Sequence, residues 1–503
     1  MILAWIILVP FIGGVLAWVL GSRNASLGRW TALLVLLADA FLVADLWTGS
    51  SGAEELSRGV WISEVIVPWV PRLGIGLHLA VDGLSLLLIA LTVFLGLIAV
   101  LCSWREVRER VGFFHFNLLW VLAGILGVFL ALDLFLFYLF WELMLIPMYL
   151  LIAIWGHAER VRAARKFFLF TQAGGLLMLL SILALYVAQG ARSGLYSFDY
   201  LLLLGADLPP ASSRWIMLGF VIAFAVKIPA VPLHTWLPDA HTEAPTAGSV
   251  LLAGLLLKTG AYGLLRFVLP LFPEAAAALA PAAMTVAVAG IISGAVLAFG
   301  QRDLKRLVAY TSVSHMGFVL LGIFSGTAMA LSGAVMQMLA HGVSTGALFL
   351  IVGMVQERIH SRELGRMGGF WSSAPRLSAA GLVLCLASLG IPGSGNFVAE
   401  FLVLLGTWSV SMPLTAVAAA GLVLSAVYSL GIVQQVFHGP AVSAEGPADL
   451  SLRESGMLAV MIALILWLGI FPGPVLRTAG PVVQAVLCCA SPGHIPPAAG
   501  VAP

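Results

Sequence analysis

The chain has 503 residues, of which 61% are hydrophobic and only 10% carry a charge. A soluble domain has roughly 25% charged residues, so a soluble fold could not hide this much apolar surface, and the composition predicts an all-α, multi-pass integral membrane protein. The net charge of +2 is too small to suggest nucleic-acid binding. No basic residue precedes Arg23, so the first apolar run is predicted to be a transmembrane helix rather than a signal peptide.

A spanning helix needs about 20 mostly apolar residues. Two of the predicted spans should be broken, because Pro229, Pro232 and Pro238 interrupt one, and Pro392 and Gly393 interrupt the other. The residues after 473 are predicted to form a short tail. The fourteen predicted helices cover 2–20, 30–48, 79–102, 113–131, 134–155, 166–189, 215–238, 248–269, 278–299, 306–325, 329–354, 377–408, 412–437 and 455–474.

Basic residues divide unequally between the two sets of alternate loops, with 17 on one side and 6 on the other. Loops rich in lysine and arginine stay on the inner side of a membrane. The division therefore predicts that both termini lie outside and that residues 49–78 form the largest external loop.

Charged residues and prolines gather in residues 225–260, between two apolar runs. Charge within an apolar chain is expensive and by default marks function. Helices broken at membrane depth are tolerated only where protein or a water-filled cavity surrounds them. The stretch is thus typical of a discontinuous helix beside an ion pathway, with possible supporting roles for His234, Asp239 and His241.

Three isolated charges are predicted to lie deep in the membrane. Glu142 is the lone charge in the span 134–155, Lys227 lies about twelve residues into its span, and Lys258 falls near the centre of the next one. Such a lysine can bind or release a proton when a charged partner moves. The alternatives are a hydrogen-bonded or neutral carboxyl and lysines that snorkel to the surface.

Two histidines and a further carboxylate follow in later spans. His315 and His341 lie in successive helices, and Glu400 stands alone after the Pro-Gly break. A titratable imidazole suits a proton relay, although a single buried histidine is more often a hydrogen-bonded core residue. Ser312 and Ser314 could orient waters beside them.

Equal spacings suggest an internal repeat. Glu142 and Lys227 are 85 residues apart, and so are His315 and Glu400. Two five-helix units of opposite orientation, 113–269 and 278–437, would explain this and would form a transporter architecture. The remaining segments would be an N-terminal three-helix segment, 1–112, and a C-terminal helix with a short tail, 438–503.

No redox or metal motif is present in the sequence. The cysteines Cys102, Cys385, Cys488 and Cys489 have no metal-ligand spacing, and no dinucleotide, phosphate-loop or haem motif occurs. We therefore expect no metal and no cofactor in this chain.

Four stretches resemble a known family: FWELMLIPMYLLI, KIPAVPLHTWLPDAHTEAPTAGSVLLAGLLLKTGAYG, QRDLKRLVAYTSVSHMG and IPGSGNFVAEF. With them, nearly the whole chain resembles the antiporter-like subunits of respiratory complex I, the proton-pumping NADH:quinone oxidoreductase. The second stretch is specific to a wider superfamily that includes cation/proton antiporters and membrane-bound hydrogenases. The L and N relatives carry a lysine where this chain has Glu400, and glutamate after Gly-Asn-Phe is the pattern of the M subunits.

The resemblance implies roles for the buried titratable groups. His234 resembles a histidine of the family's broken seventh helix. From the coupling pair through the central relay to the terminal site facing outside, the implied proton-transfer groups are Glu142, Lys227, Lys258, His315, His341 and Glu400.

The resemblance also implies partners and a location. L-like and N-like antiporter subunits would be neighbours, while flavin, iron–sulfur clusters and quinone would belong to other subunits. The location would be a bacterial inner membrane with both termini on the periplasmic side, and the isolated chain would not be catalytic. The alternatives are a subunit of a cation/proton antiporter or a hydrogenase, a scaffold without a proton path, and a self-contained membrane enzyme.

Overall fold

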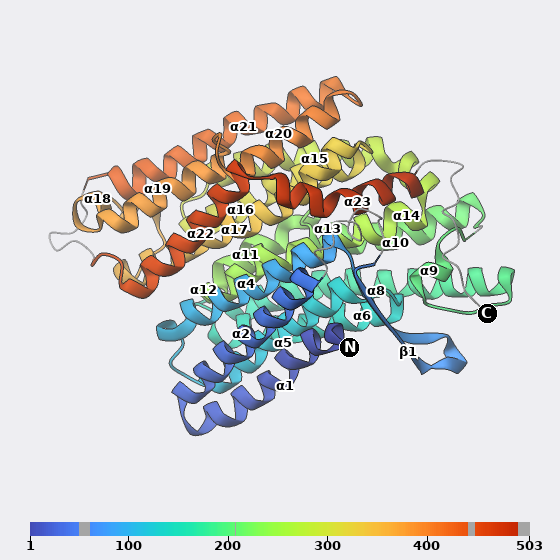
Figure 1. Ribbon diagram of the computed structural model, residues 1–503. Helices are drawn as coiled ribbons and strands as arrows, with labels where there is room; N and C mark the ends of the chain where they lie inside the picture. Colours follow the sequence, from blue (N-terminus) through green and yellow to red (C-terminus); the bar gives the residue numbers. More distant parts are fainter. Residues whose placement is uncertain (50–60, 207, 441–447, 491–503) are drawn as a thin grey trace.

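Long apolar helices make up most of the fold (Figure 1). The computed structural model describes residues 1–49, 61–206, 208–440 and 448–490. Among these residues, twelve helical segments are long and apolar enough to cross a membrane: Ile2–Arg23 (α1), Ala25–Gly49 (α2), Gly83–Glu106 (α4), Val111–Leu130 (α5), Leu134–Trp155 (α6 and α7), Arg160–Ser193 (α8), Thr246–Leu271 (α12 to α14), Pro273–Phe299 (α15), Leu304–Phe324 (α16), Ala328–Ile359 (α17), Met412–His438 (α21 and η6) and Leu452–Ile470 (α22).

The other two predicted spans are the two broken ones, and both breaks are confirmed. In the first, α10 (Pro210–Lys227) ends at the lysine, and the 3-10 turn η2 (Leu233–Thr235) leads into α11 (Trp236–Glu243). In the second, α19 (Pro375–Leu389) and α20 (Gly395–Trp408) meet at a short turn. The count of fourteen spanning helices and the inverted repeats stay predictions.

A third interruption was not predicted. The span 134–155 consists of α6 (Leu134–Leu143) and α7 (Leu145–Trp155), which meet at Met144. Pro147 explains the break, because it lacks the N–H group that would bond the carbonyl of Leu143 four residues earlier. Glu142 therefore lies at the end of a half-helix rather than within a continuous one.

Irregular helix also occurs in the segment that carries Lys258. Two π-helical turns, η3 (Leu252–Leu256) and η4 (Leu264–Val268), separate α12 (Thr246–Leu251), α13 (Leu257–Gly263) and α14 (Leu269–Leu271). Short π-helical turns inside α-helices often accompany functional sites. The remaining short elements are η1 (Pro71–Leu73), α9 (Tyr200–Leu203), η5 (Leu364–Arg366) and α18 (Phe370–Ser373), and α21 ends at Ile432 before the π turn η6 (Val433–His438).

The predicted C-terminal tail is wrong in part, because Gly473–Ala490 forms the helix α23. Gly480 and Pro481 favoured a loop in the sequence. Yet apolar residues recur at helical spacing on one face, which lies against α4 and α17 and is built from Val475, Ala479, Val482, Val483 and Val486. Residues 491–503 of the predicted tail lie outside the described part of the chain.

The all-α prediction misses a β-hairpin. Strands β1 (Ser63–Val70) and β2 (Ile75–Val81) pair antiparallel, and Gly74 adopts a positive φ of 65° in the turn between them. The predicted helix start at 79 is also wrong: α4 begins at Gly83, because the carboxylate of Asp82 accepts the N–H of Ser85 at 2.9 Å and caps it. The hairpin and α9 lie toward one end of the bundle, and α12 and α18 toward the other (Figure 1).

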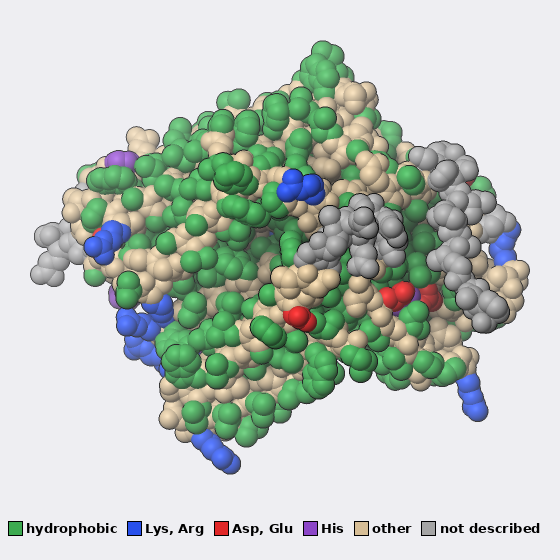
Figure 2. All heavy atoms as spheres, viewed as in Figure 1, with side chains coloured by type: hydrophobic (Ala, Val, Ile, Leu, Met, Phe, Trp, Pro, Cys, Tyr) green, Lys and Arg blue, Asp and Glu red, His purple; other side chains and the backbone are tan. Residues whose placement is uncertain are grey.

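The surface agrees with a membrane setting. The face in Figure 2 is mostly hydrophobic, and the few charged side chains on it gather chiefly toward the ends of the bundle. Large apolar side chains such as Phe41, Leu169 and Leu180 are more than half exposed on the outer helices α2 and α8. Lipid rather than water is the solvent that suits these faces.

A buried histidine fastens the hairpin to the bundle. His78 of β2 is 1% exposed, and its Nδ1 and Nε2 atoms lie 2.5 Å from Asp199 and 2.7 Å from Glu64. The N–H of Gly76 also donates to the carboxylate of Asp133, which caps the start of α6. The hairpin is thus joined to the half-helix that ends near Glu142.

The His78 contacts predict a pH dependence. Burial alone lowers the pKa of His78, but hydrogen bonds and charge from Asp199 and Glu64 outweigh it and raise the pKa above the usual value of 6.5. A raised folded-state pKa gives stability that is complete below about pH 6.5 and lost as the pH rises through the folded value. We expect hydrogen exchange of 63–81, corrected for its intrinsic rate, to speed up across that window. His78→Gln should exchange faster at low pH and show no such rise; equal behaviour of both proteins would contradict this role.

Candidate functional site

The first charged cluster lies where α6 and α10 end. Lys227 is 1% exposed, and its Nζ has no hydrogen-bond partner among the described residues. The Nζ atom instead lies 4.9 Å from the centre of the Trp141 ring and 6.0 Å from that of Phe167. A cation over an aromatic face is stabilised by the ring quadrupole, so Trp141 supports the ammonium group in place of a direct hydrogen bond.

Glu142 lies close to this lysine without a hydrogen bond to it. Its Oε1 is buried and unpartnered, and the side chains of Tyr138 and Gln172 lie beside its carboxyl group. The carboxyl packs against Gly175, and a Cβ at that position would force Oε1 to move. The structure therefore brings the predicted pair into one cluster but holds it open.

A side chain bonds the backbone carbonyl that is freed where α10 ends. The N–H of Ala230 bonds the carbonyl of Ala225 rather than that of Val226. The indole Nε1 of Trp236 donates to the freed Val226 carbonyl at 2.9 Å. A helix end in a membrane needs such a partner, and this one holds α11 against the end of the helix that carries Lys227.

The second cluster is a continuous line of buried groups. Lys258 Nζ lies 2.5 Å from the carbonyl oxygen of Ala253 and 2.6 Å from His341 Nδ1. The rings of His341 and His315 are 5.6 Å apart between centres, and His315 Nδ1 lies 2.9 Å from Glu400 Oε1. These four titratable groups come from α13, α17, α16 and α20, and none is more than 2% exposed. Their spacing allows a proton to pass along them with side-chain rotation or one water.

Glu400 lies just after the break between α19 and α20. Gly390 and Gly393 have φ values of 81° and 96°, which glycine adopts readily. The Ser394 hydroxyl accepts the N–H of Phe397 at 3.4 Å and begins α20. These residues place the carboxyl one turn and a half inside a new helix, against His315.

Among the supporting residues predicted from the sequence, some are buried without hydrogen-bond partners and others have partners elsewhere in the fold. His241 is fully buried with both ring nitrogens unpartnered, and Ser312 Oγ is buried without a partner. Ser314 instead donates to the carbonyl of Ile291 at 2.9 Å, so it serves helix packing. Asp239 bridges Lys166 and Arg306 at 2.7 and 2.8 Å, at the half-exposed end of the bundle and away from the relay. His234 is 9% exposed, and its ring centre is 6.3 Å from that of Tyr310.

Sequence reasoning missed several groups at the relay. Gln337 Nε2 donates to Glu400 Oε1 at 3.0 Å, while Ser388 Oγ and the Tyr428 hydroxyl lie 3.3 and 3.4 Å from His315 Nε2. Gln337 had a usable signal, because it precedes His341 by four residues and so shares its helix face. Ser388 and Tyr428 had none, since their approach depends on tertiary packing. Within the described residues, no group of three metal-ligating side chains occurs.

A membrane bundle with broken helices, each beside buried titratable groups, defines an antiporter-like membrane protein. A family model described as NADH:quinone oxidoreductase/Mrp antiporter, TM, matches residues 131–426. The chain belongs to this family, as the sequence resemblance predicted.

Individual relatives and solved structures show which members of the family this chain is similar to. The chain is 52% identical to NADH-quinone oxidoreductase subunit M of Pseudomonas aeruginosa over 487 residues, 95% of each protein. It is 51% identical to the protein of that name from Escherichia coli K12, over 95% of this chain and 96% of the relative. A chain of respiratory complex I from Thermus thermophilus has 34% identity and a TM-score of 0.88, covering 98% of this chain and 100% of that one. A chain of the Mrp complex from Dietzia has 22% identity, a TM-score of 0.82 and 97% and 100% coverage, so it shares the fold.

Proposed function

We propose that this chain is a proton-translocating membrane subunit of a bacterial NADH:quinone oxidoreductase. The observation that carries the proposal is the buried line Lys258–His341–His315–Glu400, with contacts of 2.6 Å at one end and 2.9 Å at the other. Relatives that are half identical over nearly the whole chain bear the name of that enzyme's subunit M. A purely structural scaffold has no need to bury four titratable groups in contact, because each is costly to bury.

The mechanism we propose is electrostatic. A charge change in a neighbouring subunit alters the distance between Glu142 and Lys227. At an effective dielectric near 20, two unit charges about 4 Å apart interact by about 4 kcal/mol, which shifts a protonation equilibrium about a thousandfold. When the pair opens, Lys227 loses this stabilisation and releases its proton toward Lys258, the histidines and Glu400.

In this proposal the chain carries no redox chemistry itself. Flavin, iron–sulfur clusters and quinone belong to other subunits, and L-like and N-like antiporter subunits lie beside this chain in the inner membrane. The isolated chain is then not catalytic. Purifying a tagged chain and identifying its companions separates this assignment from an Mrp-type antiporter, which shares the fold.

The coupling role of the first cluster is testable in the assembled complex. We expect Glu142→Gln and Lys227→Ala to lower NADH-driven quinone reduction and proton uptake strongly, because each removes one charge of the pair. Glu142→Asp should keep part of the activity, because the charge survives. Near-normal turnover of an assembled Glu142→Gln complex would exclude the pair as the coupling element.

Glu400 should act as a titratable group rather than as a structural acceptor. We expect Glu400→Gln to assemble but lose much of its proton uptake. Glu400→Lys should retain clearly more than Glu400→Ala, because an ammonium group there could donate to Gln337 Oε1, which is buried and unpartnered. An active Gln variant together with an inactive Lys variant would end the proposal that protons leave through this residue.

The orientation rests on the unequal loop charges. In a chain with Cys488 and Cys489 replaced by serine, we introduce single cysteines at the exposed positions Arg72 and Arg162. A membrane-impermeant maleimide should label Arg72→Cys from the periplasmic side and Arg162→Cys only in inverted vesicles. The reverse labelling pattern would overturn the orientation.

A further inference from the structure

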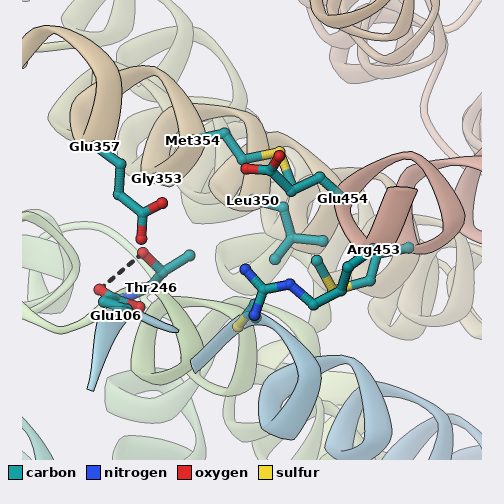
Figure 3. Close-up of a pocket in the computed structure, with 10 residues that line it drawn as sticks. Glu106, Thr246, Leu350, Gly353, Met354, Glu357, Arg453 and Glu454 are labelled. Carbon is teal, nitrogen blue, oxygen red and sulfur yellow. Dashed lines mark hydrogen bonds between the residues drawn. The ribbon is translucent and has the colours of Figure 1, made fainter. Parts of the chain in front are cut away.

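A small cavity lies away from the proposed coupling pair. It has a volume of about 20 Å³, enough for one water. It lies where the ends of α4 and α17 meet the starts of α12 and α22 (Figure 3). By the loop charges, this is the inner end of the bundle. Its lining includes Glu106, Thr246, Glu357, Arg453 and Glu454.

Two of the carboxyl groups around this cavity have no ion-pair partner within the described chain. Glu106 Oε1 accepts the N–H and the hydroxyl of Thr246 at 2.9 and 3.0 Å, while its Oε2 is buried and unpartnered. Glu357 is exposed at the mouth and directs its carboxylate toward Glu106 and Thr246 (Figure 3). A solvent-facing carboxyl and an inner one therefore flank space for a single water.

The other two charged groups at the cavity have partners elsewhere, although Arg453 Nε is buried and has none among the described residues. Glu454 pairs with Arg358 at 3.0 Å, and the guanidinium of Arg453 donates to the carbonyl of Leu101 at 2.9 Å. Glu454 is thereby held ionised and oriented. Glu106 and Glu357 are left as the pair able to exchange a proton across the cavity.

Buried titratable groups continue inward from Glu106. Lys305 is 1% exposed and donates to the carbonyl of Ala244 at 2.5 Å, two residues before the Thr246 whose N–H donates to Glu106. His241 lies in α11, three residues before Ala244, and the charges of Lys305 and Lys258 both act on its ring.

His241 has the properties of a transfer group rather than a packing residue. It is 0% exposed, and neither ring nitrogen has a partner. Its ring lies flat on Phe349, with 4.6 Å between centres and 3° between planes. A buried polar ring costs free energy unless something bonds it, and a water or a passing proton would supply that partner.

We propose that this line is a proton-uptake port that reloads Lys258 from the inner side, after its proton has moved toward Glu400, by a path that does not include Lys227. The inference rests on the proposed function and adds the route by which the relay is refilled. A proton from solution binds Glu357 and crosses the cavity water as an O–H bond breaks on one side and forms on the other. Lys305 passes an N–H proton through His241 to Lys258, and Glu106 then reprotonates the Lys305 amine. No oxidant or reductant takes part.

Replacing Glu106 with glutamine distinguishes a role in proton transfer from a purely structural role. Glu106→Gln keeps an acceptor oxygen for Thr246 but cannot carry a proton, whereas Glu106→Asp can still carry one. In inverted vesicles containing the whole complex, we expect Glu106→Gln to slow NADH-driven proton uptake roughly tenfold at about pH 8, where protons are scarce, and less at about pH 6. Glu106→Asp should restore part of the rate. The control is Glu109→Gln, an exposed position three residues further on, which should match the wild type.

A second variant tests whether the groups form one path. His241→Phe keeps the ring stack on Phe349 and removes both nitrogens, so it should show the same pH-dependent loss. Combined with Glu106→Gln it should be no slower than either change alone, because blocking one path twice adds nothing.

The outcomes distinguish this port from the proposed function. If Glu106→Gln and His241→Phe both behave like Glu109→Gln while Glu400→Gln still abolishes uptake, the port is overturned and the proposed function stands. If only Glu106→Ala is impaired, Glu106 merely caps α12, which also overturns the port. If Glu400→Gln and Glu142→Gln also show wild-type proton uptake, both the port and the proposed function are overturned.

Discussion

The backbone polar groups and buried charges of this protein must find hydrogen-bond partners within the protein, because the bilayer core offers none. Three of the irregular turns in the described chain recruit a side chain. Trp236 bonds the carbonyl freed at the end of α10, Ser394 begins α20, and Lys258 bonds a carbonyl of the π turn before it. The last case is instructive, since one ammonium group serves both the backbone and the relay. The helix breaks thus place the functional groups as well as interrupting the helices.

The two charged clusters are held in different states. Lys227 has no hydrogen-bond partner and rests against aromatic rings, while Lys258 and Glu400 each contact a histidine. Burying an unpaired ammonium group is costly, so in the proposed mechanism the open pair favours loss of the Lys227 proton and a closer Glu142 favours its return. In the second cluster each titratable group has at least one hydrogen-bond partner, although His341 Nε2 is buried and has none among the described residues. In that mechanism, a charge movement near α6 acts on the Glu142–Lys227 cluster, where fewer hydrogen bonds have to break.

Much of this arrangement could be predicted from sequence, since composition, apolar run length and lone charges report burial directly. Both predicted broken helices are present because proline and glycine act locally. The hairpin and α23 were missed because their short apolar patterns are weak beside those of spanning helices. The contacts of Ser388 and Tyr428 with His315 could not be predicted, since helices distant in sequence bring them together. Pro147 did carry a readable signal for the break beside Glu142.

The equal 85-residue spacings gain meaning from the contacts, although the repeat itself rests on sequence. If the two units are inverted copies, Glu142 and Lys227 correspond to His315 and Glu400. The first pair is open and the second is in contact at 2.9 Å. The closed pair lies at the end of the buried line that begins at Lys258 and His341. In the proposed mechanism this asymmetry sets the direction of proton transfer, because the open pair favours release of a proton and the closed pair can receive one.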